Sequence, residues 1–307
     1  MQVALLFPGQ GAQTPGFLRR LPQHPAVHAT LNDARRILNE DLDQLDSAAA
    51  LKSTVAVQLS TVIAGVATAR ALSAAGAGVD AVAGLSVGAF AAAVACEALE
   101  FGDALRLVKL RAQSMAEAVP SGFGMAAILG LTERGVLDLV ARVSERSALY
   151  LASVNAPTEM VVSGERAALA LAADEARARG AAVRMLQVEV PSHCPLMDGV
   201  SSRLRAAMRG VSWLGPRVPY VSNHRARATH LAAEVAEDLI LNVARTVRWH
   251  DSLTLLHELG CRLYLQTPPG QVLARLIEAS FPDARAVALE EAALASAVRL
   301  ARRAAGA

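Results

Sequence analysis

The sequence lacks the features that mark several classes of protein. Charged residues make up only 19% of the 307 residues, and 30 Lys and Arg against 28 Asp and Glu leave a net charge of +2. Because this excess is small and the arginines are scattered, we expect no binding of nucleic acid or of an anionic membrane. Hydrophobic residues make up 53% of the chain, which excludes a disordered protein, since disordered chains are poor in apolar residues.

Cysteines and membrane-length segments are also scarce. Cys96, Cys194 and Cys261 show no pairing or metal-ligand spacing, which favours a reducing cytoplasm and predicts no metal site. The longest charge-free stretches, 53–69 and 81–96, are shorter than the roughly 18 apolar residues of a membrane span and contain polar residues. We therefore expect buried elements of a soluble core. The opening MQVALLFPGQG has no basic segment before its apolar run, so we expect no secretory signal.

Short apolar runs alternate with longer helical segments at both ends of the chain. Strands are predicted at Val3–Phe7, Ala81–Ala83, Val218–Ser222 and Arg262–Gln266. Helices are predicted at Pro25–Leu38, Thr54–Ala75, Val87–Leu99, Ala104–Ala118, Leu196–Arg209, Ala232–Val243, Trp249–Leu259 and Val272–Ala279. Asp103 is a predicted N-cap, Pro120 a predicted helix end, and the last ten residues are expected to fray. This alternation predicts a large α/β domain, residues 1–123 and 191–307, with a mainly parallel sheet covered on both faces.

The middle of the chain follows a different order. Strands are predicted at Met125–Gly130, Ala148–Val154, Met160–Ser163 and Ala182–Val190, with helices at Glu133–Ser147 and Arg166–Arg179. The segment Asn155-Ala156-Pro157 is a predicted turn between the two middle strands. The order β-α-β-β-α-β is that of a ferredoxin-like unit. We therefore expect residues 124–190 to form a small subdomain inserted into the large one.

The segment Gly84-Leu85-Ser86-Val87-Gly88 matches G-x-S-x-G between a predicted strand and a predicted helix. A nucleophilic serine needs such a sharp turn to project its Oγ away from the sheet, and small flanking residues allow that turn. The N–H of Val87, at the start of the helix, would then stabilise an oxyanion. The alternative is a glycine-rich turn with an idle serine.

A nucleophilic serine needs a base, and the sequence has seven histidines. His193 differs from the others because it follows a predicted strand and has prolines on both sides, in Val190-Pro191-Ser192-His193-Cys194-Pro195. It also lies where the two predicted domains join, a common place for pockets. We therefore take His193 as the candidate base. A surface or capping role is expected for the other six, which are His24, His28, His224, His230, His250 and His257.

Two further segments have both a functional and a structural interpretation. The glycines of FPGQGAQ, residues 7–13, would let Gln10 or its N–H approach an oxyanion, and the segment lacks the Lys and spacing of a phosphate loop. Arg111 lies on an otherwise apolar helical segment and needs a partner, for which a bound carboxylate is a candidate. These residues alone favour the structural interpretations, a simple turn and a solvated helix face.

Taken together and in order, these motifs resemble the malonyl-CoA:acyl carrier protein transacylases over nearly the whole chain. The matching segments are LLFPGQGAQ, GLSVGAFAAAVACEAL, LVKLRAQSM, GMAAILG, VNAPTEMVVSG, VEVPSHCPLM, TVRWHDSL and PPGQVLARL. One such motif has little specificity, whereas eight in register are highly specific. The resemblance implies a large α/β-hydrolase-like domain together with the small inserted subdomain.

The resemblance implies a role for each matched residue. Ser86 takes the acyl group from coenzyme A, and His193 acts as base and acid. The N–H groups of Gln10 and Val87 form the oxyanion hole, and Arg111 binds the free carboxylate of a malonyl group. A buried Arg would disfavour an uncharged acetyl group, because that group leaves the cation unpaired.

The remaining implied site residues include two departures from the family pattern. Leu85 stands where the family usually has His, which removes a polar neighbour of the acyl carboxylate, so we expect a different chain-length preference or rate. Asn242 stands where a Gln carbonyl orients the catalytic His, a mild change because any residue supplies that carbonyl. Asn155 is expected in the substrate site. The resemblance implies no bound cofactor and no metal, with malonyl-CoA as donor and a carrier-protein phosphopantetheine-type arm as acceptor.

The acceptor separates two interpretations within the family. The segments GLSVGAF, PGQGAQ and LPQHPAVHATL look most like the transacylase (epsilon) subunit of bacterial malonate decarboxylase, which implies the small carrier protein of that complex as partner. The alternative is a transacylase of fatty-acid synthesis. A serine hydrolase is a further alternative, although no Asp or Glu in a triad setting lies between Ser86 and His193. An inactive docking subunit is the last, suggested only by Leu85.

Overall fold

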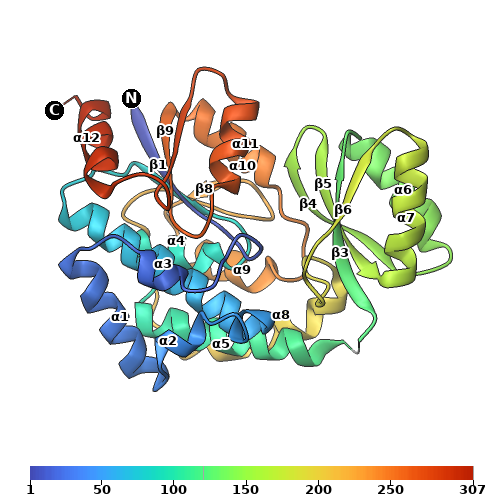
Figure 1. Ribbon diagram of the computed structural model, residues 1–307, viewed down its shortest axis with the longest axis horizontal. Helices are drawn as coiled ribbons and strands as arrows, with labels where there is room; N and C mark the ends of the chain where they lie inside the picture. Colours follow the sequence, from blue (N-terminus) through green and yellow to red (C-terminus); the bar gives the residue numbers. More distant parts are fainter. Residues whose placement is uncertain (120, 307) are drawn as a thin grey trace.

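The computed structural model describes residues 1–119 and 121–306, which contain two separate β-sheets (Figure 1). The strands of the larger sheet are Gln2–Phe7 (β1), Ala81–Gly84 (β2), Tyr220–Val221 (β7), Ala228–Thr229 (β8), Cys261–Gln266 (β9) and Arg285–Ala288 (β10). Their order is β10-β9-β1-β2-β7-β8, and every neighbouring pair is parallel except β7 and β8. The predicted mainly parallel sheet is therefore confirmed, with β8 and β10 as strands that were not predicted.

Alternate residues of β1 enter two different cores, so the sheet is covered on both faces. Val3, Leu5 and Phe7 join one cluster, and Ala4 and Leu6 join the other. Helices against the first face include Pro25–Leu38 (α1), Leu42–Leu45 (α2), Thr54–Ala74 (α3), Gly88–Ala95 (α4), Phe101–Ala118 (α5), Asp198–Met208 (α8), Ala232–Leu241 (α9) and Leu294–Ala304 (α12). Helices against the second are Trp249–Glu258 (α10) and Val272–Ser280 (α11).

Helix α3 is the most apolar long element of the described chain. It is the one described helix that is long and apolar enough to cross a membrane, but 89% of its most apolar window is buried within the fold. Gly65 lets this helix approach the sheet, because a Cβ there would lie 3.0 Å from the Phe7 ring and 3.1 Å from the Ala91 side chain. Its apolar character is therefore that of a core helix.

The smaller sheet is antiparallel and comes from the middle of the chain. Its strands are Phe123–Leu129 (β3), Leu149–Ala156 (β4), Glu159–Glu165 (β5) and Ala182–Met185 (β6), in the order β4-β5-β3-β6. Helices Glu133–Ser144 (α6) and Arg166–Ala178 (α7) cover its outer face, away from the larger sheet (Figure 1). Helices and strands thus follow the predicted order β-α-β-β-α-β.

Several predicted element boundaries are wrong. Asn155 and Ala156 belong to strand β4, and the turn is made by Pro157 and Thr158, because pairing of Ala156 with Glu159 extends the hairpin. The last predicted strand of this region ends at Met185 rather than at residue 190. Helix α4 is also shorter than predicted, since residues beyond Ala95 leave the helix before Leu99 pairs with Trp213.

The two ends of α5 and the C-terminus need similar corrections. Helix α5 begins at Phe101, so Asp103 lies in its first turn and is not the N-cap; Pro120, the predicted end, lies outside the described residues. Of the last ten residues, 298–304 belong to α12 and do not fray, whereas Ala307 lies outside the described residues. Helix α12 buries Ala297 and Ala301 in the first core, and the Met1 amino group donates to the Ala304 carbonyl at 3.0 Å. An Ala- and Arg-rich composition therefore concealed a packed amphipathic helix.

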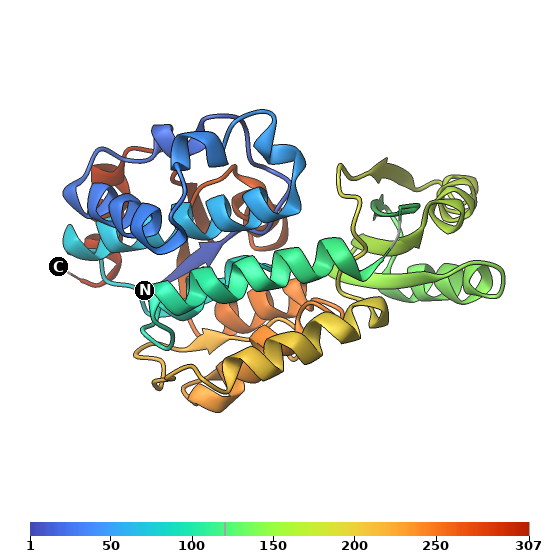
Figure 2. The same ribbon diagram turned by 90° about the horizontal axis from the view of Figure 1, so that it is seen from below.

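The two sheets are joined beside the point where the chain returns to the larger part. Figure 2 shows α5 and α8 running side by side toward the small sheet. Val154 donates to the Val247 carbonyl and Val247 donates to the Ala152 carbonyl, both at 2.9 Å, so β4 is hydrogen-bonded to the segment before α10. The Arg248 guanidinium pairs with the Glu133 carboxylate of α6. These contacts join the small sheet to the larger part beside the candidate site.

Candidate active site

Ser86 lies on a sharp turn between β2 and α4. Its φ of +54° is in the left-handed region that non-glycine residues rarely adopt. Gly84 and Gly88 make the turn possible, because a Cβ on Gly84 would lie 2.2 Å from the Gly88 carbonyl and one on Gly88 would lie 2.3 Å from the Phe7 carbonyl oxygen. The predicted strand–turn–helix geometry is present, and it places the half-buried Ser86 at the carboxyl end of β2.

His193 is the histidine that the fold brings to Ser86. Its Nε2 lies 2.8 Å from the Ser86 Oγ, although the two residues are 107 positions apart. Its Nδ1 contacts the backbone carbonyl of Asn242, which accepts only, so Nδ1 carries the proton and Nε2 accepts from Ser86. The His193 N–H also donates to the Val243 carbonyl at 2.7 Å. Main-chain contacts thus orient the ring without a carboxylate.

The environment keeps His193 neutral. The residue is only 6% exposed. Burial and the nearby Arg111 cation lower the pKa of His193 from 6.5 to about 4, an effect that its backbone hydrogen bonds only partly oppose. A neutral imidazole at neutral pH is the form that accepts a proton from a serine hydroxyl.

Arg111 is buried beside the nucleophile and has no acidic partner among residues 1–119 and 121–306. Its Nη2 donates to the Ser86 Oγ at 3.3 Å, its Nη1 donates to the Gln58 side chain, and its Nε has no hydrogen-bond partner in the described chain. Burial lowers the pKa of Arg111 to about 9. The solvated-face interpretation is therefore wrong, and the site holds a desolvated cation that an anionic ligand would neutralise.

Gln10 and Val87 flank Ser86 with free backbone donors. A Cβ on Gly9 would lie 3.0 Å from the Leu85 carbonyl oxygen and 3.5 Å from the Ser86 Cβ, so the loop after β1 runs against the elbow. Within the described chain, neither the Gln10 N–H nor the Val87 N–H donates a hydrogen bond. Val87 immediately precedes α4, where the helix dipole favours negative charge. Both groups are thus available for an oxyanion.

Of the other predicted residues, Asn242 and Leu85 lie beside Ser86, whereas Asn155 makes no hydrogen bond to the site among the residues that the structure describes. Asn242 lies at the end of α9, where its carbonyl contacts His193 and its Nδ2 donates to the Ser86 carbonyl at 3.4 Å. Leu85 precedes Ser86 and packs against the second core. Asn155 is buried, but its side chain bonds to Ser153 and Glu159, and in the described chain it makes no hydrogen bond to Ser86, His193 or Arg111.

Sequence reasoning missed two polar residues that support the site. The Gln58 Oε1 accepts a hydrogen bond from Arg111, and the Gln58 Nε2 donates to the Thr54 hydroxyl. The Thr54 hydroxyl in turn donates to the Gln10 side chain at 3.2 Å. A glutamine within a long apolar helix was a usable signal. Asn223 accepts the Ser86 N–H at 2.9 Å from a loop 137 residues away, and no local pattern marks it.

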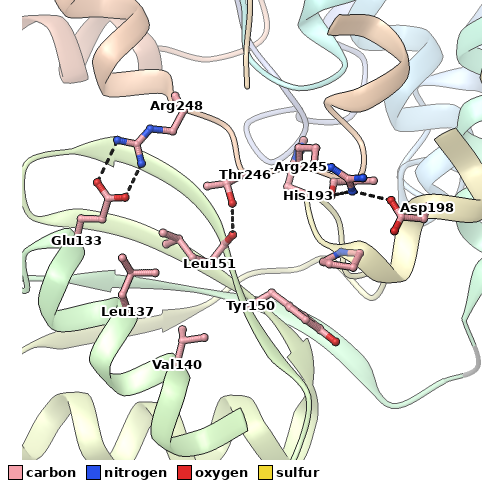
Figure 3. A pocket seen from close by; sticks show the side chains of 12 residues that line it. Glu133, Leu137, Val140, Tyr150, Leu151, His193, Asp198, Arg245, Thr246 and Arg248 are labelled. Atoms are coloured by element: carbon pink, nitrogen blue, oxygen red, sulfur yellow. Dashed lines mark hydrogen bonds and ion pairs between the residues drawn. The ribbon is translucent and has the colours of Figure 1, made fainter. Parts of the chain in front are cut away.

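A cavity of about 530 Å³ opens between the small sheet and the larger part, and His193 lies on its wall (Figure 3). Glu133, Leu137 and Val140 of α6 line one side, and Arg245, Thr246 and Arg248 line the other (Figure 3). A long flexible substrate arm entering this cavity would reach the His193 ring.

Together these groups have the arrangement that acyl transfer through a serine ester would require. Ser86 faces a neutral imidazole, the N–H groups of Gln10 and Val87 make no hydrogen bond in the described chain, and a buried cation lies 3.3 Å from the Ser86 Oγ. A hydrolase triad would require a carboxylate on His193, and in the described chain a backbone carbonyl occupies that position instead.

Comparison with known proteins agrees with this geometry. The family model of the acyl transferase domain matches residues 4–302. The malonyl CoA-acyl carrier protein transacylase of Salmonella typhimurium is 32% identical over 303 residues, which cover 96% of this chain and 98% of the relative.

Solved structures show the same likeness. The acyl-carrier-protein S-malonyltransferase of Burkholderia pseudomallei has a TM-score of 0.93 at 33% identity, covering 97% of this chain and 100% of that chain. A malonyl-transacylase solved in complex with a type II polyketide synthase acyl-carrier protein has a TM-score of 0.92 at 29% identity, covering 99% and 100%. The chain therefore belongs to the acyl transferase domain family and is an acyltransferase.

Proposed function

We propose that the protein transfers a malonyl group from malonyl-CoA to the arm of an acyl carrier protein through a malonyl ester of Ser86. The observation that carries this proposal is the buried Arg111 cation, which lies 3.3 Å from the Ser86 Oγ and has no carboxylate partner in the described chain. A malonyl thioester supplies the missing carboxylate on the acyl group that Ser86 attacks. The names of the relatives support the same donor and acceptor.

The reaction proceeds in two balanced half-reactions. His193 Nε2 takes the Ser86 proton while Oγ attacks the thioester carbon, and the N–H groups of Gln10 and Val87 bind the oxyanion. The C–S bond then breaks, and His193 returns the proton to the departing coenzyme A thiolate. In the second half-reaction His193 deprotonates the carrier thiol, which attacks the malonyl ester, and the proton finally returns to Ser86.

The remaining groups that we assign lie around the reacting atoms. Residues 124–190, the ferredoxin-like unit, and residues 1–123 with 191–307, the hydrolase-like unit, form opposite walls of the cavity in which the thioester arm lies. Leu85 borders the acyl group, and Asn155 contacts the substrate after rearrangement of its bonds to Ser153 and Glu159. The compartment we assign is the cytoplasm, in keeping with three cysteines that are all free thiols.

Two carrier proteins are candidates for the acceptor, that of fatty-acid synthesis and that of malonate decarboxylase. The relatives are named as malonyl CoA-acyl carrier protein transacylases, and a solved relative is bound to the carrier of a type II polyketide synthase, so they favour a general acyl carrier protein of the fatty-acid type. None of these names mentions malonate decarboxylase. The carrier of that complex stays a candidate on the resemblance of GLSVGAF, PGQGAQ and LPQHPAVHATL alone.

Intact-mass spectrometry after brief exposure to malonyl-CoA tests the nucleophile and the donor. We expect one malonyl adduct on the native protein, none on Ser86→Ala, and little from acetyl-CoA. An undiminished adduct on Ser86→Ala would remove Ser86 from the role. Absence of any adduct with the native protein would promote the docking-subunit interpretation.

A second experiment resolves the acceptor. The malonyl-enzyme is mixed with the phosphopantetheine-bearing carrier of fatty-acid synthesis or with the carrier of malonate decarboxylase, and kcat/KM is compared. Faster transfer to the first supports the fatty-acid interpretation, and faster transfer to the second supports the decarboxylase subunit. Rapid hydrolysis of the ester without either thiol would indicate a serine hydrolase.

A further inference from the structure

The strained turn at Ser86 is hydrogen-bonded to the Asn223 side chain, which comes from the loop after β7. Asn223, which follows β7 and is 1% exposed, accepts the Ser86 N–H with its Oδ1 at 2.9 Å. Its Nδ2 donates to the Gly84 carbonyl at 2.8 Å. One amide therefore binds the backbone on both sides of Leu85 and satisfies the N–H that the left-handed Ser86 directs away from the strand ladder.

Asn223 is in turn held by a buried carboxylate. Asp238 of α9 is fully buried, and its Oδ1 accepts the Asn223 N–H at 2.8 Å, while its Oδ2 lies 3.4 Å from the Asn223 Nδ2. Tyr220 donates to the same Oδ2 at 2.7 Å, and the His224 Nδ1–H donates to Oδ1 at 2.9 Å. The carboxylate thus has the donors that a buried charge requires.

Helix α9 connects this network to the base. Asp238 and Asn242 are four residues apart, so they lie on the same face of the helix, and the Asn242 N–H donates to the Asp238 carbonyl at 2.8 Å. Asn242 contacts His193 through its carbonyl and Ser86 through its amide. The end of one helix therefore sets the position of nucleophile and base relative to each other.

We propose that Asn223 and Asp238 are positioning residues, which hold the Ser86 turn so that Oγ stays in line with His193 Nε2. The inference rests on Ser86 being the nucleophile of the proposed function. A left-handed non-glycine residue persists only where its surroundings hold it. Without the Asn223 amide, the Ser86 peptide relaxes and Oγ leaves its 2.8 Å contact with His193.

A fluorophosphonate probe tests this role independently of malonyl-CoA. Ser86 Oγ attacks phosphorus, fluoride leaves, and His193 takes the proton, so the second-order labelling rate reports the alignment of nucleophile and base. We expect Asn223→Ala to lower this rate at least fivefold and Asp238→Asn to lower it by a smaller but measurable factor. The KM for malonyl-CoA should change less than threefold, because neither residue touches the cavity.

Ser201→Ala is the matched control. Ser201 also makes a buried hydrogen bond to α9, donating to the Ile240 carbonyl at 2.8 Å, but its contact does not reach the elbow. It should label at the native rate. A loss below fivefold in folded Asn223→Ala, or an equal loss in Ser201→Ala, would overturn the proposal.

Folding is followed by circular dichroism in every variant. If Asn223→Ala does not fold, Asp238→Asn decides: a loss above twofold supports the proposal and a smaller one overturns it. Native protein that labels with the probe but forms no malonyl adduct would contradict the proposed function while leaving this inference open to the same comparison.

Discussion

At the scale of single residues, the selectivity that we propose for the acyl group depends on one buried charge. Arg111 is 1% exposed, and Gln58 is its nearest polar partner besides Ser86. Binding an uncharged acyl group leaves the guanidinium desolvated without a counter-ion, whereas a carboxylate neutralises it. The Arg111 charge would therefore favour a malonyl group mainly by disfavouring uncharged acyl groups.

Arg111→Ala should reduce this discrimination. Loss of a buried charge pair costs about 2 kcal/mol or more, which corresponds to roughly a 30-fold fall in the ratio of kcat/KM for malonyl-CoA over acetyl-CoA. Arg111→Lys keeps the charge but not the planar guanidinium, so its ratio should lie between those of the native protein and Arg111→Ala. Competition assays with both thioesters measure the ratio, and an unchanged ratio in Arg111→Ala would remove this residue from acyl selection.

As the proposed base, His193 is expected to set the acid limit of the reaction. Because burial and Arg111 lower its pKa to about 4, the ring stays neutral and basic down to that pH. The kcat/KM for acylation should be flat from pH 8 to about 5 and fall with unit slope below about 4. Rapid-quench measurement after a brief pH jump from neutral buffer avoids unfolding. A limb near the ordinary histidine pKa would show that His193 is not shielded as the structure indicates.

At the scale of elements, the elbow depends on close approach between the loop after β1 and the start of α4. Gly88 is in contact with the backbone there, because an added Cβ would lie 2.3 Å from the Phe7 carbonyl oxygen and 2.6 Å from that of Pro8. Because these are backbone atoms, they cannot move aside by a change of side-chain rotamer. The proposed oxyanion donors, Gln10 and Val87, come from these same two segments.

Gly88→Ala should therefore separate the two segments. We expect a loss of about 1–3 kcal/mol in the free energy of unfolding from overpacking, together with loss of malonyl-enzyme formation. Gly78→Ala is the control, since a Cβ there meets nothing within 4 Å. Urea unfolding and intact-mass spectrometry check both effects. Native-like acylation in Gly88→Ala would show that the close contact does not position the oxyanion donors.

At the scale of the whole molecule, His193 couples the site to the stability of the fold. The ring lies where the chain returns from the small sheet, and the residue is 6% exposed and contacts Ser86, Asn242 and Val243 of the larger part. A histidine whose pKa falls on folding binds a proton more readily in the unfolded chain. Stability is therefore undiminished above about pH 6.5 and decreases as the pH falls toward 4.

The magnitude follows from the two pKa values. A fall from 6.5 to about 4 corresponds to about 3 kcal/mol of unfolding free energy lost between neutral pH and pH 4. Urea titrations at a series of pH values should show this loss in the native protein. His193→Gln cannot take up the proton and should show correspondingly less, while carboxylate titration affects both proteins alike. Equal pH dependence in the two would contradict the neutral buried ring.

Local sequence was sufficient for the features that depend on near neighbours. The Gly84–Gly88 turn, the apolar run of β1 and the proline-bounded His193 carry their information within a few residues, and they predicted the elbow, the sheet and the base. The resemblance of eight segments added the expectation for Arg111, which its helix alone did not support. The composition of the last ten residues misled, because it does not show that α12 has a core to pack against.

Only the tertiary structure decided which distant residues meet. Asn223 lies 137 residues from Ser86, and Gln58 lies 53 residues from Arg111, so no spacing in the chain connects them. Asp238 is likewise unmarked in the sequence, where it resembles any carboxylate on a helix, and only the fold shows that it is fully buried. Hydrogen bonding and desolvation depend on distance in space, and folding alone creates those distances. The sequence by itself therefore determined the turn and the candidate nucleophile on it, and the fold determined how Ser86 is held.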